Sequence, residues 1–261
     1  MKTFISFLSA AALAFCSLAS VEAQSSSPRS KPAATTKTES ASDTATPAES
    51  SVPARTDVYH VHFVKAALGK ATQLADDLKA PDPQEPKPGH TMILRHQEGD
   101  AWDYAVIQHM GTTATVAAAR PTPAASVREL SDWHNDTLVS GPSWAEFSKA
   151  MGIDESDKSK TKDSVYVISV YRPAAGHRDQ LEKMLSAEPS PGDTTAGSVL
   201  MRHLEGAPWT FLTIARYNSW QDFGKNESNS VATTSKNEGG WFQLREHASY
   251  HTDTLADRLM P

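Results

Sequence analysis

The chain has 261 residues, of which 39% are hydrophobic and 21% are charged, and its formal net charge at pH 7 is −6. This mildly acidic balance, without a basic cluster, argues against nucleic acid and anionic membranes as partners. The single cysteine, Cys16, lies in the apolar N-terminal segment, so the rest of the chain can form neither a disulfide nor a cysteine-ligated metal site.

Residues 1–23 have the pattern of a secretory signal peptide. Lys2 gives a positive start, and the apolar run after it is short for a membrane span and ends in small residues typical of a cleavage site. Residues 24–56 are mostly Ser, Thr, Ala, Pro, Lys and Glu, a composition that cannot bury enough apolar surface to offset chain entropy. We therefore expect a secreted or periplasmic protein with a disordered linker and no membrane span after signal cleavage.

The part of the chain from residue 57 onward contains an internal repeat. The string RHQEGDAW begins at Arg95, and RHLEGAPW begins at Arg202, 107 positions later. The same offset relates residues 58–111 to a second segment without a gap. So many matches in one register predict a tandem duplication, with repeat 1 at residues 57–153 and repeat 2 at residues 154–261.

Each predicted repeat begins with a strand and a helix. Apolar residues at alternate positions predict strands at the start of both repeats, and apolar residues at helical spacing predict a helix after each strand. The RHxEGxxW string then joins two more strands as a β-hairpin. In this hairpin Gly99 and Gly206 are expected to supply a positive φ, and Trp102 and Trp209 to cover the sheet.

A second repeated string, His-x-Asp-Thr-Leu, closes each repeat. It starts at His134 and at His251, and apolar residues at helical spacing around it predict a helix in both copies. The predicted order in each repeat is therefore β-α-β-β-α. No clear fourth strand is visible, and residues 113–119 and 230–234 are the nearest candidates for one.

Two such units in tandem resemble the ferredoxin-like units of the dimeric α/β-barrel superfamily. Residues 165–185 and 198–223, which include the string TIARYNSWQDF, carry the resemblance best. The superfamily includes antibiotic-biosynthesis monooxygenases, EthD-like and NIPSNAP-like proteins, and the haem-binding chlorite dismutases. The resemblance implies an α+β fold in which two ferredoxin-like repeats pair within one chain as an intramolecular barrel, so that a monomeric pseudo-dimer suffices. No catalytic residues of a characterised member can be mapped onto this chain.

The repeated strings also supply the candidate site residues. In a helix, positions two apart point to opposite sides, so His251 and Asp253 are not expected to form a dyad. Each repeated histidine is expected either to be buried and hydrogen-bonded within its own repeat or to line a pocket in which the arginines bind an anion. For His251 the expected partners are Glu205, Arg202 and His203. The candidate ligand-binding residues are Arg95, His96, Trp102, His134, Arg202, His203, Trp209 and His251.

His60 and His62 lie two positions apart on a predicted strand, so their imidazoles share a face, as in many zinc and copper sites. No third ligand is evident nearby, and repeat 2 has Val167 and Ser169 at these positions. The sequence therefore favours a polar pair lining the barrel and predicts no metal. No cofactor is predicted either. Haem binding can be tested by mixing the protein with haem and looking for a Soret band.

Three functions stay open at this point. The leading hypothesis is an exported protein that binds a small molecule between the sheet and the helices or in the barrel lumen. The first alternative is a cofactor-independent monooxygenase or isomerase that uses an inward-facing histidine as the general base. The second is a non-catalytic structural or interaction module on a flexible tether. The sequence assigns no catalytic residue and does not decide whether the protein is an enzyme.

Overall fold

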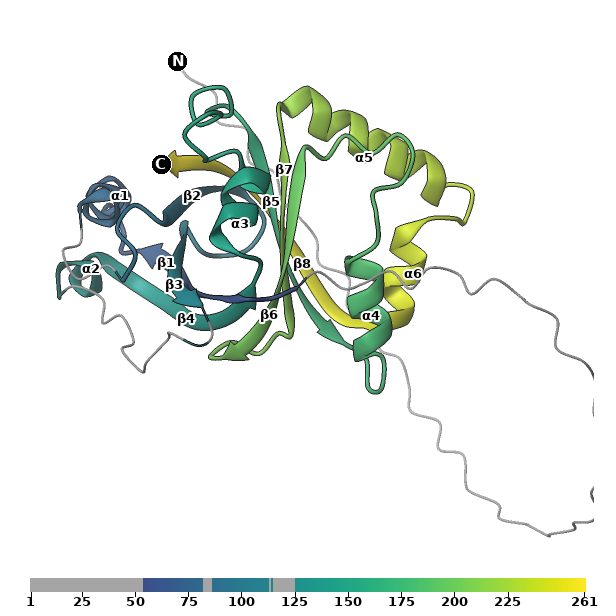
Figure 1. Cartoon of the computed structure of the whole chain (residues 1–261), viewed down its shortest axis with the longest axis horizontal. Helices are drawn as coiled ribbons and strands as arrows, with labels where there is room; N and C mark the ends of the chain where they lie inside the picture. Colours follow the sequence, from purple (N-terminus) through teal and green to yellow (C-terminus); the bar gives the residue numbers. More distant parts are fainter. Residues whose placement is uncertain (1–53, 82–85, 113, 115–124) are drawn as a thin grey trace, which may run out of the picture. The chain divides into compact units, whose positions relative to one another are not determined.

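The computed structural model describes residues 54–81, 86–112, 114 and 125–261. The predicted signal peptide and residues 24–53 of the predicted linker lie outside these ranges. The described strands form one closed antiparallel barrel in the order β1-β3-β2-β8-β5-β7-β6-β4 (Figure 1). Their bounds are β1 Asp57–Ala66, β2 Thr91–Glu98, β3 Tyr104–Thr112, β4 Ser131–Gly141, β5 Val165–Pro173, β6 Gly197–Glu205, β7 Phe211–Tyr217 and β8 Ala248–Met260.

The same pairing pattern occurs in both halves of the chain. In the first half β1 pairs with β3 and β4, and β2 pairs with β3. In the second half β5 pairs with β7 and β8, and β6 pairs with β7. Two seams, β2 with β8 and β4 with β6, join the halves. Each half therefore leaves strand edges that the other half pairs, and closure removes the exposed edges.

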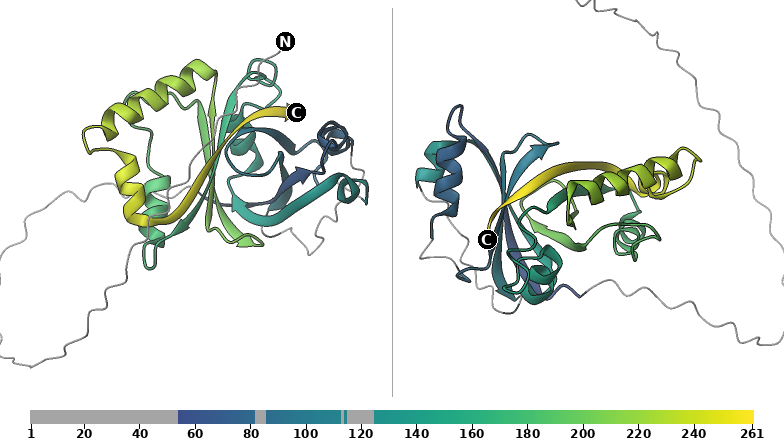
Figure 2. Two further views of the ribbon diagram at one scale, coloured as in Figure 1. Left: turned by 180° about the vertical axis from the view of Figure 1, so that it is seen from behind. Right: turned by 90° about the horizontal axis from the view of Figure 1, so that it is seen from above.

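Helices α1 and α2 lie on one side of the barrel, and α4, α5 and α6 lie on the other (Figure 2). Leu74 of α1 packs on Val64 and Tyr104 in the first half, and Leu181 of α4 packs on Tyr171 and Phe211 in the second. None of the described helices is long and apolar enough to cross a membrane. Their bounds are α1 Ala71–Lys79, α2 Ala125–Leu130, α3 Trp144–Met151, α4 Arg178–Leu185, α5 Trp220–Thr234 and α6 Gly240–His247.

A single apolar cluster to which all eight strands contribute fills the barrel interior. The helix α3 closes over it with Phe147 and Met151, both fully buried. A capping box between Ser143 and Glu146 fixes the start of α3, because each side chain satisfies a backbone N–H of the first turn. The strand residues of the cluster are Tyr59, Val61, Phe63, Met92, Leu94, Ala105, Ile107, Val139, Tyr166, Ile168, Val170, Val199, Met201, Leu212, Ile214 and Ala256.

The predicted closing helices are wrong over the His-x-Asp-Thr-Leu strings. Short helices, α2 and α6, do occur, but they end at Leu130 and His247, and the strings themselves lie in β4 and β8. These strands are the missing fourth strands of the two halves. The apolar spacing misled because the buried face of β8 alternates Thr254, Ala256 and Arg258, which carries little hydrophobic signal.

The two segments considered as fourth strands have different outcomes. Residues 230–234 belong to α5, so the structure contradicts that candidate. Residues 113–119 lie outside the described residues apart from position 114.

Candidate metal centre

Two histidines of β1 and one aspartate of β4 meet on the outer face of the sheet. Tyr59 and Val61 point into the barrel core, and because side chains alternate along a strand, His60 and His62 point outward. The antiparallel register places Asp136 directly opposite His62. Since cross-strand neighbours on one face lie close together, the pairing of β1 with β4 is what assembles the cluster.

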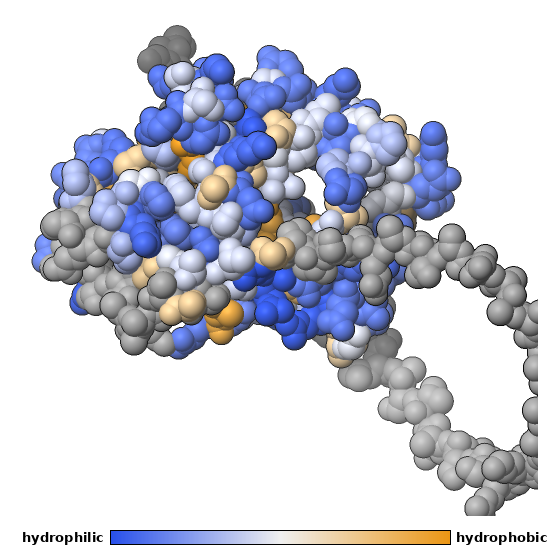
Figure 3. All heavy atoms as spheres, viewed as in Figure 1, coloured by the Kyte–Doolittle hydropathy of each residue, from blue (hydrophilic) through white to orange (hydrophobic). Residues whose placement is uncertain are grey.

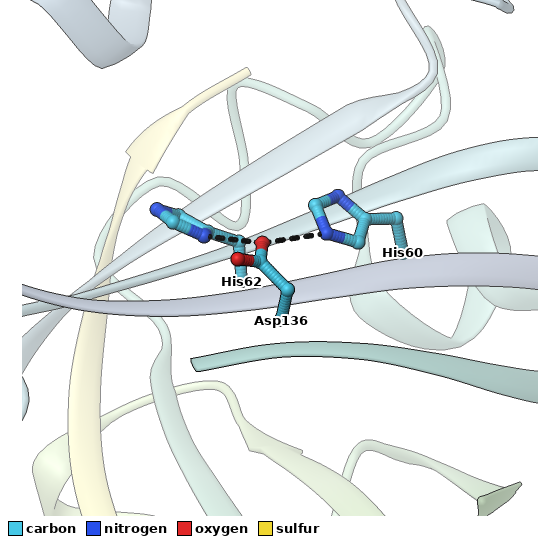
Figure 4. A group of neighbouring side chains, drawn as sticks. All are labelled: His60, His62 and Asp136. Atoms are coloured by element: carbon cyan, nitrogen blue, oxygen red, sulfur yellow. Dashed lines mark hydrogen bonds and ion pairs between the residues drawn. The ribbon is translucent and has the colours of Figure 1, made fainter. Parts of the chain in front are cut away.

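Both histidines contact the same carboxylate oxygen. The Nε2 atom of His60 and the Nδ1 atom of His62 each lie 2.8 Å from Oδ1 of Asp136 (Figure 4). The two histidine residues are only 9% and 5% exposed. The three potential ligand atoms all lie within 4.8 Å of one another, and no other such group occurs among the residues that the structure describes. Asp136 is therefore the third potential ligand, which the sequence pattern did not reveal.

A third histidine reaches the other oxygen of the same carboxylate. His134 Nδ1 lies 2.8 Å from Oδ2 of Asp136, and the His134 side chain is 45% exposed. The expectation that the His-x-Asp string cannot form a dyad is therefore wrong for this copy. In a strand, positions two apart share a face, whereas the predicted helix would have separated them.

The electrostatics of the cluster keep the carboxylate ionised. Burial alone would raise the pKa of Asp136, but hydrogen bonds and charge interactions with His60 and His62 outweigh burial and hold that pKa well below its usual value. The Nε2 atom of His62 is buried and has no hydrogen-bond partner. One ring nitrogen of His96, of His203 and of His251 is likewise buried without a partner, so this feature alone does not distinguish the cluster.

The second half presents the same register with different side chains. Ser169 of β5 faces Asp253 of β8 in the way that His62 faces Asp136. Val167 stands two positions before Ser169, where the first half has His60. The aspartate is thus present in both halves, but β5 has no counterparts of the two histidines of β1.

The histidine of the second string, His251, is placed differently from the prediction. Its side chain is 20% exposed, and its Nε2 atom lies 3.8 Å from Oδ2 of Asp253. Its ring stacks on Tyr171, with ring centroids 6.1 Å apart. The expected partners Glu205, Arg202 and His203 are therefore wrong, because β8 turns His251 toward β5.

The hairpin residues lie apart from the cluster. Trp102 and Trp209 are core residues, 4% and 7% exposed. His96 and His203 each meet the neighbouring tryptophan edge-on at 5.6 Å. No hydrogen bond or ring contact joins them to His134 or His251 within the described part of the chain, so the predicted convergence of these histidines is not observed.

The two repeated arginines are also separate from the cluster. Arg95 of β2 donates two hydrogen bonds to Asp257 of β8, at 3.0 and 2.8 Å. This ion pair crosses the seam between the halves and involves none of the nearby glutamates of the repeated strings. Arg202 lies on β6 opposite Ser140 of β4, on the other seam.

Comparison with known proteins supports the fold. Neither a protein-family model nor a curated protein matches the chain. An anthrone oxidase-like protein of known structure aligns over 80% of this chain and 93% of its own, with 9% identity and a TM-score of 0.51. A candidate monooxygenase from Lactobacillus acidophilus NCFM aligns over 78% and 94%, with 9% identity and a TM-score of 0.43, which is too low to carry an argument. The first likeness shows the fold alone, and it agrees with the resemblance to dimeric α/β-barrel proteins.

Proposed function

We propose that the protein binds a divalent first-row transition-metal ion through His60, His62 and Asp136. The observation that carries the proposal is the contact of two buried imidazole nitrogens with one carboxylate oxygen, at 2.8 Å each. Two histidines and one carboxylate are a recurrent ligand set for iron and zinc.

The ligand set favours a reactive ion over a structural one. Structural zinc sites use four protein ligands, whereas three ligands leave coordination positions for water or a substrate. When bound, such an ion would supply Lewis-acid or redox chemistry at these open positions. His134 would hold Oδ2 of Asp136 and so orient the carboxylate, as outer hydrogen-bonding partners of metal ligands commonly do.

A second candidate function needs no metal. His134 and Asp136 form a dyad in which the carboxylate fixes the imidazole tautomer, which is the arrangement of a general base. This geometry supports the cofactor-independent monooxygenase or isomerase alternative, with a small organic molecule bound between sheet and helices. The fold likeness to an anthrone oxidase-like protein is compatible with it. Metal removal separates the two candidates, because only the first requires an ion.

We further infer that the two halves arose by tandem duplication and work as a monomer. The repeated strings and the common pairing pattern of the two halves support this inference. Export from the cytosol is also part of the proposal, and it rests on the residue pattern of positions 1–23.

The experiment is a metal titration of the chelator-stripped protein. Zn²⁺ binding is followed by calorimetry and Co²⁺ binding by its visible absorption, for the wild type and for His62→Ala. Loss of an outer hydrogen-bonding partner already weakens metal affinity by about 10–100-fold, so loss of a ligand should weaken it by at least that factor. The wild type is expected to bind one ion per chain.

The matched control is His177→Ala. His177 lies 2.9 Å from His247, in a histidine pair separate from the cluster, so its loss should leave the affinity unchanged. A wild type that binds no ion, or a His62→Ala variant that binds as tightly as the control, would contradict the proposal.

A further inference from the structure

A hairpin from the second half of the chain packs directly on the aspartate of the candidate metal centre. Gly206 occupies the turn between β6 and β7 and has a φ of +116°. A Cβ atom at this position would lie 2.9 Å from Cα of Thr137 and still closer to the carbonyl oxygen of Asp136. Only glycine permits both this backbone conformation and this approach of two chain segments.

The hairpin of β6 and β7 supports β4 on the side opposite β1. On one side β1 pairs with β4 through the whole cluster, including His62 opposite Asp136. On the other side the register of β6 with β4 ends at the pair of Leu138 and Glu205, two positions short of Asp136. Beyond that pair the turn at Gly206 touches the Asp136 backbone. Asp136 is therefore held between β1 and this turn.

Resting on the proposed function, we propose that Gly206 is a positioning residue for the metal site. Its turn supports the backbone at Asp136 from the side opposite β1 and thereby helps to fix the place of the carboxylate relative to His60 and His62. The first half supplies all three ligands, and the second half fixes where one of them stands. This role gives a functional reason for the glycine of the second RHxEGxxW string.

The chain contains its own control for this inference. Gly99, in the first RHxEGxxW string, has a φ of +129°, and a Cβ atom there would lie 2.7 Å from Cα of Thr254 and slightly closer to the carbonyl oxygen of Asp253. The steric situation is the same as at Gly206. The aspartate it touches, however, faces Ser169 and not a histidine.

The experiment compares Gly206→Ala with Gly99→Ala. Both variants should lose thermal stability, because both place a Cβ atom against backbone at a positive φ. Only Gly206→Ala should also weaken Zn²⁺ binding, by about tenfold or more as expected for a lost supporting contact. Its Co²⁺ absorption should change in shape as well, because the ligand geometry changes. Equal affinities and equal Co²⁺ spectra in the two variants would overturn the inference.

A strongly destabilised variant can still be tested. An ion that binds only the folded state raises the melting temperature, so the rise on adding Zn²⁺ is measured for both variants under the same conditions. The rise should be smaller for Gly206→Ala than for Gly99→Ala, and equal rises would again overturn the inference. Absence of Zn²⁺ binding by the wild type would instead refute the proposed function, so the two failures are distinguishable.

Discussion

Asp136 uses both of its carboxylate oxygens, one for His60 and His62 and the other for His134. An ionised carboxylate can only accept hydrogen bonds, so each of these histidines directs an N–H toward it. An imidazole binds a metal through a nitrogen that carries no proton, so a ligand ring would keep its single proton on the other nitrogen. The site is thus a carboxylate surrounded by three imidazoles, each of which can present either ring nitrogen by a change of tautomer or of ring orientation.

A second buried contact between a histidine and an aspartate lies at the start of the barrel, away from this cluster. The Nε2 atom of His109 lies 2.8 Å from Oδ2 of Asp57, and both side chains are less than a tenth exposed. Burial lowers the pKa of His109, and the opposing attraction of Asp57 does not restore it. In the unfolded chain His109 binds a proton at about pH 6.5, whereas in the folded protein it does so only at a lower pH.

Acidification should accordingly destabilise the protein through His109. The unfolded state binds more protons once the pH falls below about 6.5, so the free energy of unfolding should drop as the pH is lowered from about 7 to about 5. In His109→Gln the amide still donates to Asp57 but does not titrate, so the drop should be smaller. Urea unfolding of both proteins at several pH values measures this. Parallel pH profiles would show that His109 is not the cause.

At the scale of the elements, one register places different side chains in the two halves. His62 faces Asp136 and His60 faces Leu138 across β1 and β4. Across β5 and β8, Ser169 faces Asp253 and the residue two positions earlier, Val167, faces Leu255. The backbone register of the candidate site is therefore present twice, and β5 lacks the two histidines that β1 supplies.

Two substitutions should build that second site. The double variant Val167→His, Ser169→His places two imidazoles beside Asp253 at the spacing of the first cluster. Zn²⁺ binding should rise from one ion to two per chain, measured as metal content after gel filtration. The variant Val167→Ala, Ser169→Ala removes the same side chains without adding ligands and should stay at one. A double-histidine variant that also stays at one would mean that register alone does not make the site.

The sequence predicted the elements with regular apolar patterns and missed those without them. Alternation identifies β1 and β5, and the glycine of each RHxEGxxW string identifies the hairpins, which the structure confirms. In β4 and β8 the buried face includes Thr137, Thr254 and Arg258, so the apolar residues that remain imitate a helix. This error also hid Asp136, because a helix would not place it opposite His62. Two features of the sequence pointed to strands at these positions: the threonine in each His-x-Asp-Thr-Leu string, and the lack of a fourth strand in the predicted order of each repeat.

On the scale of the whole molecule, the two halves depend on each other at both seams. The hairpin of each half packs by its glycine on the last strand of the other half, at Asp136 in one case and at Asp253 in the other. The face seen in Figure 3 is mainly hydrophilic, with small separate apolar patches. The glycine of each RHxEGxxW string thus lets the two halves pack together as one barrel. The candidate metal centre lies beside one of the two seams.

The most direct test of the metal-site proposal is the anomalous diffraction of crystals grown with Zn²⁺, recorded on both sides of the zinc absorption edge. The proposal predicts one edge-dependent peak at about 2.0–2.2 Å from a nitrogen of His60, a nitrogen of His62 and an oxygen of Asp136. The hydrogen bonds that join these side chains in the structure would then be replaced by the ion. A zinc-saturated crystal with no peak at this position, and with both His–Asp hydrogen bonds intact, would contradict the proposal.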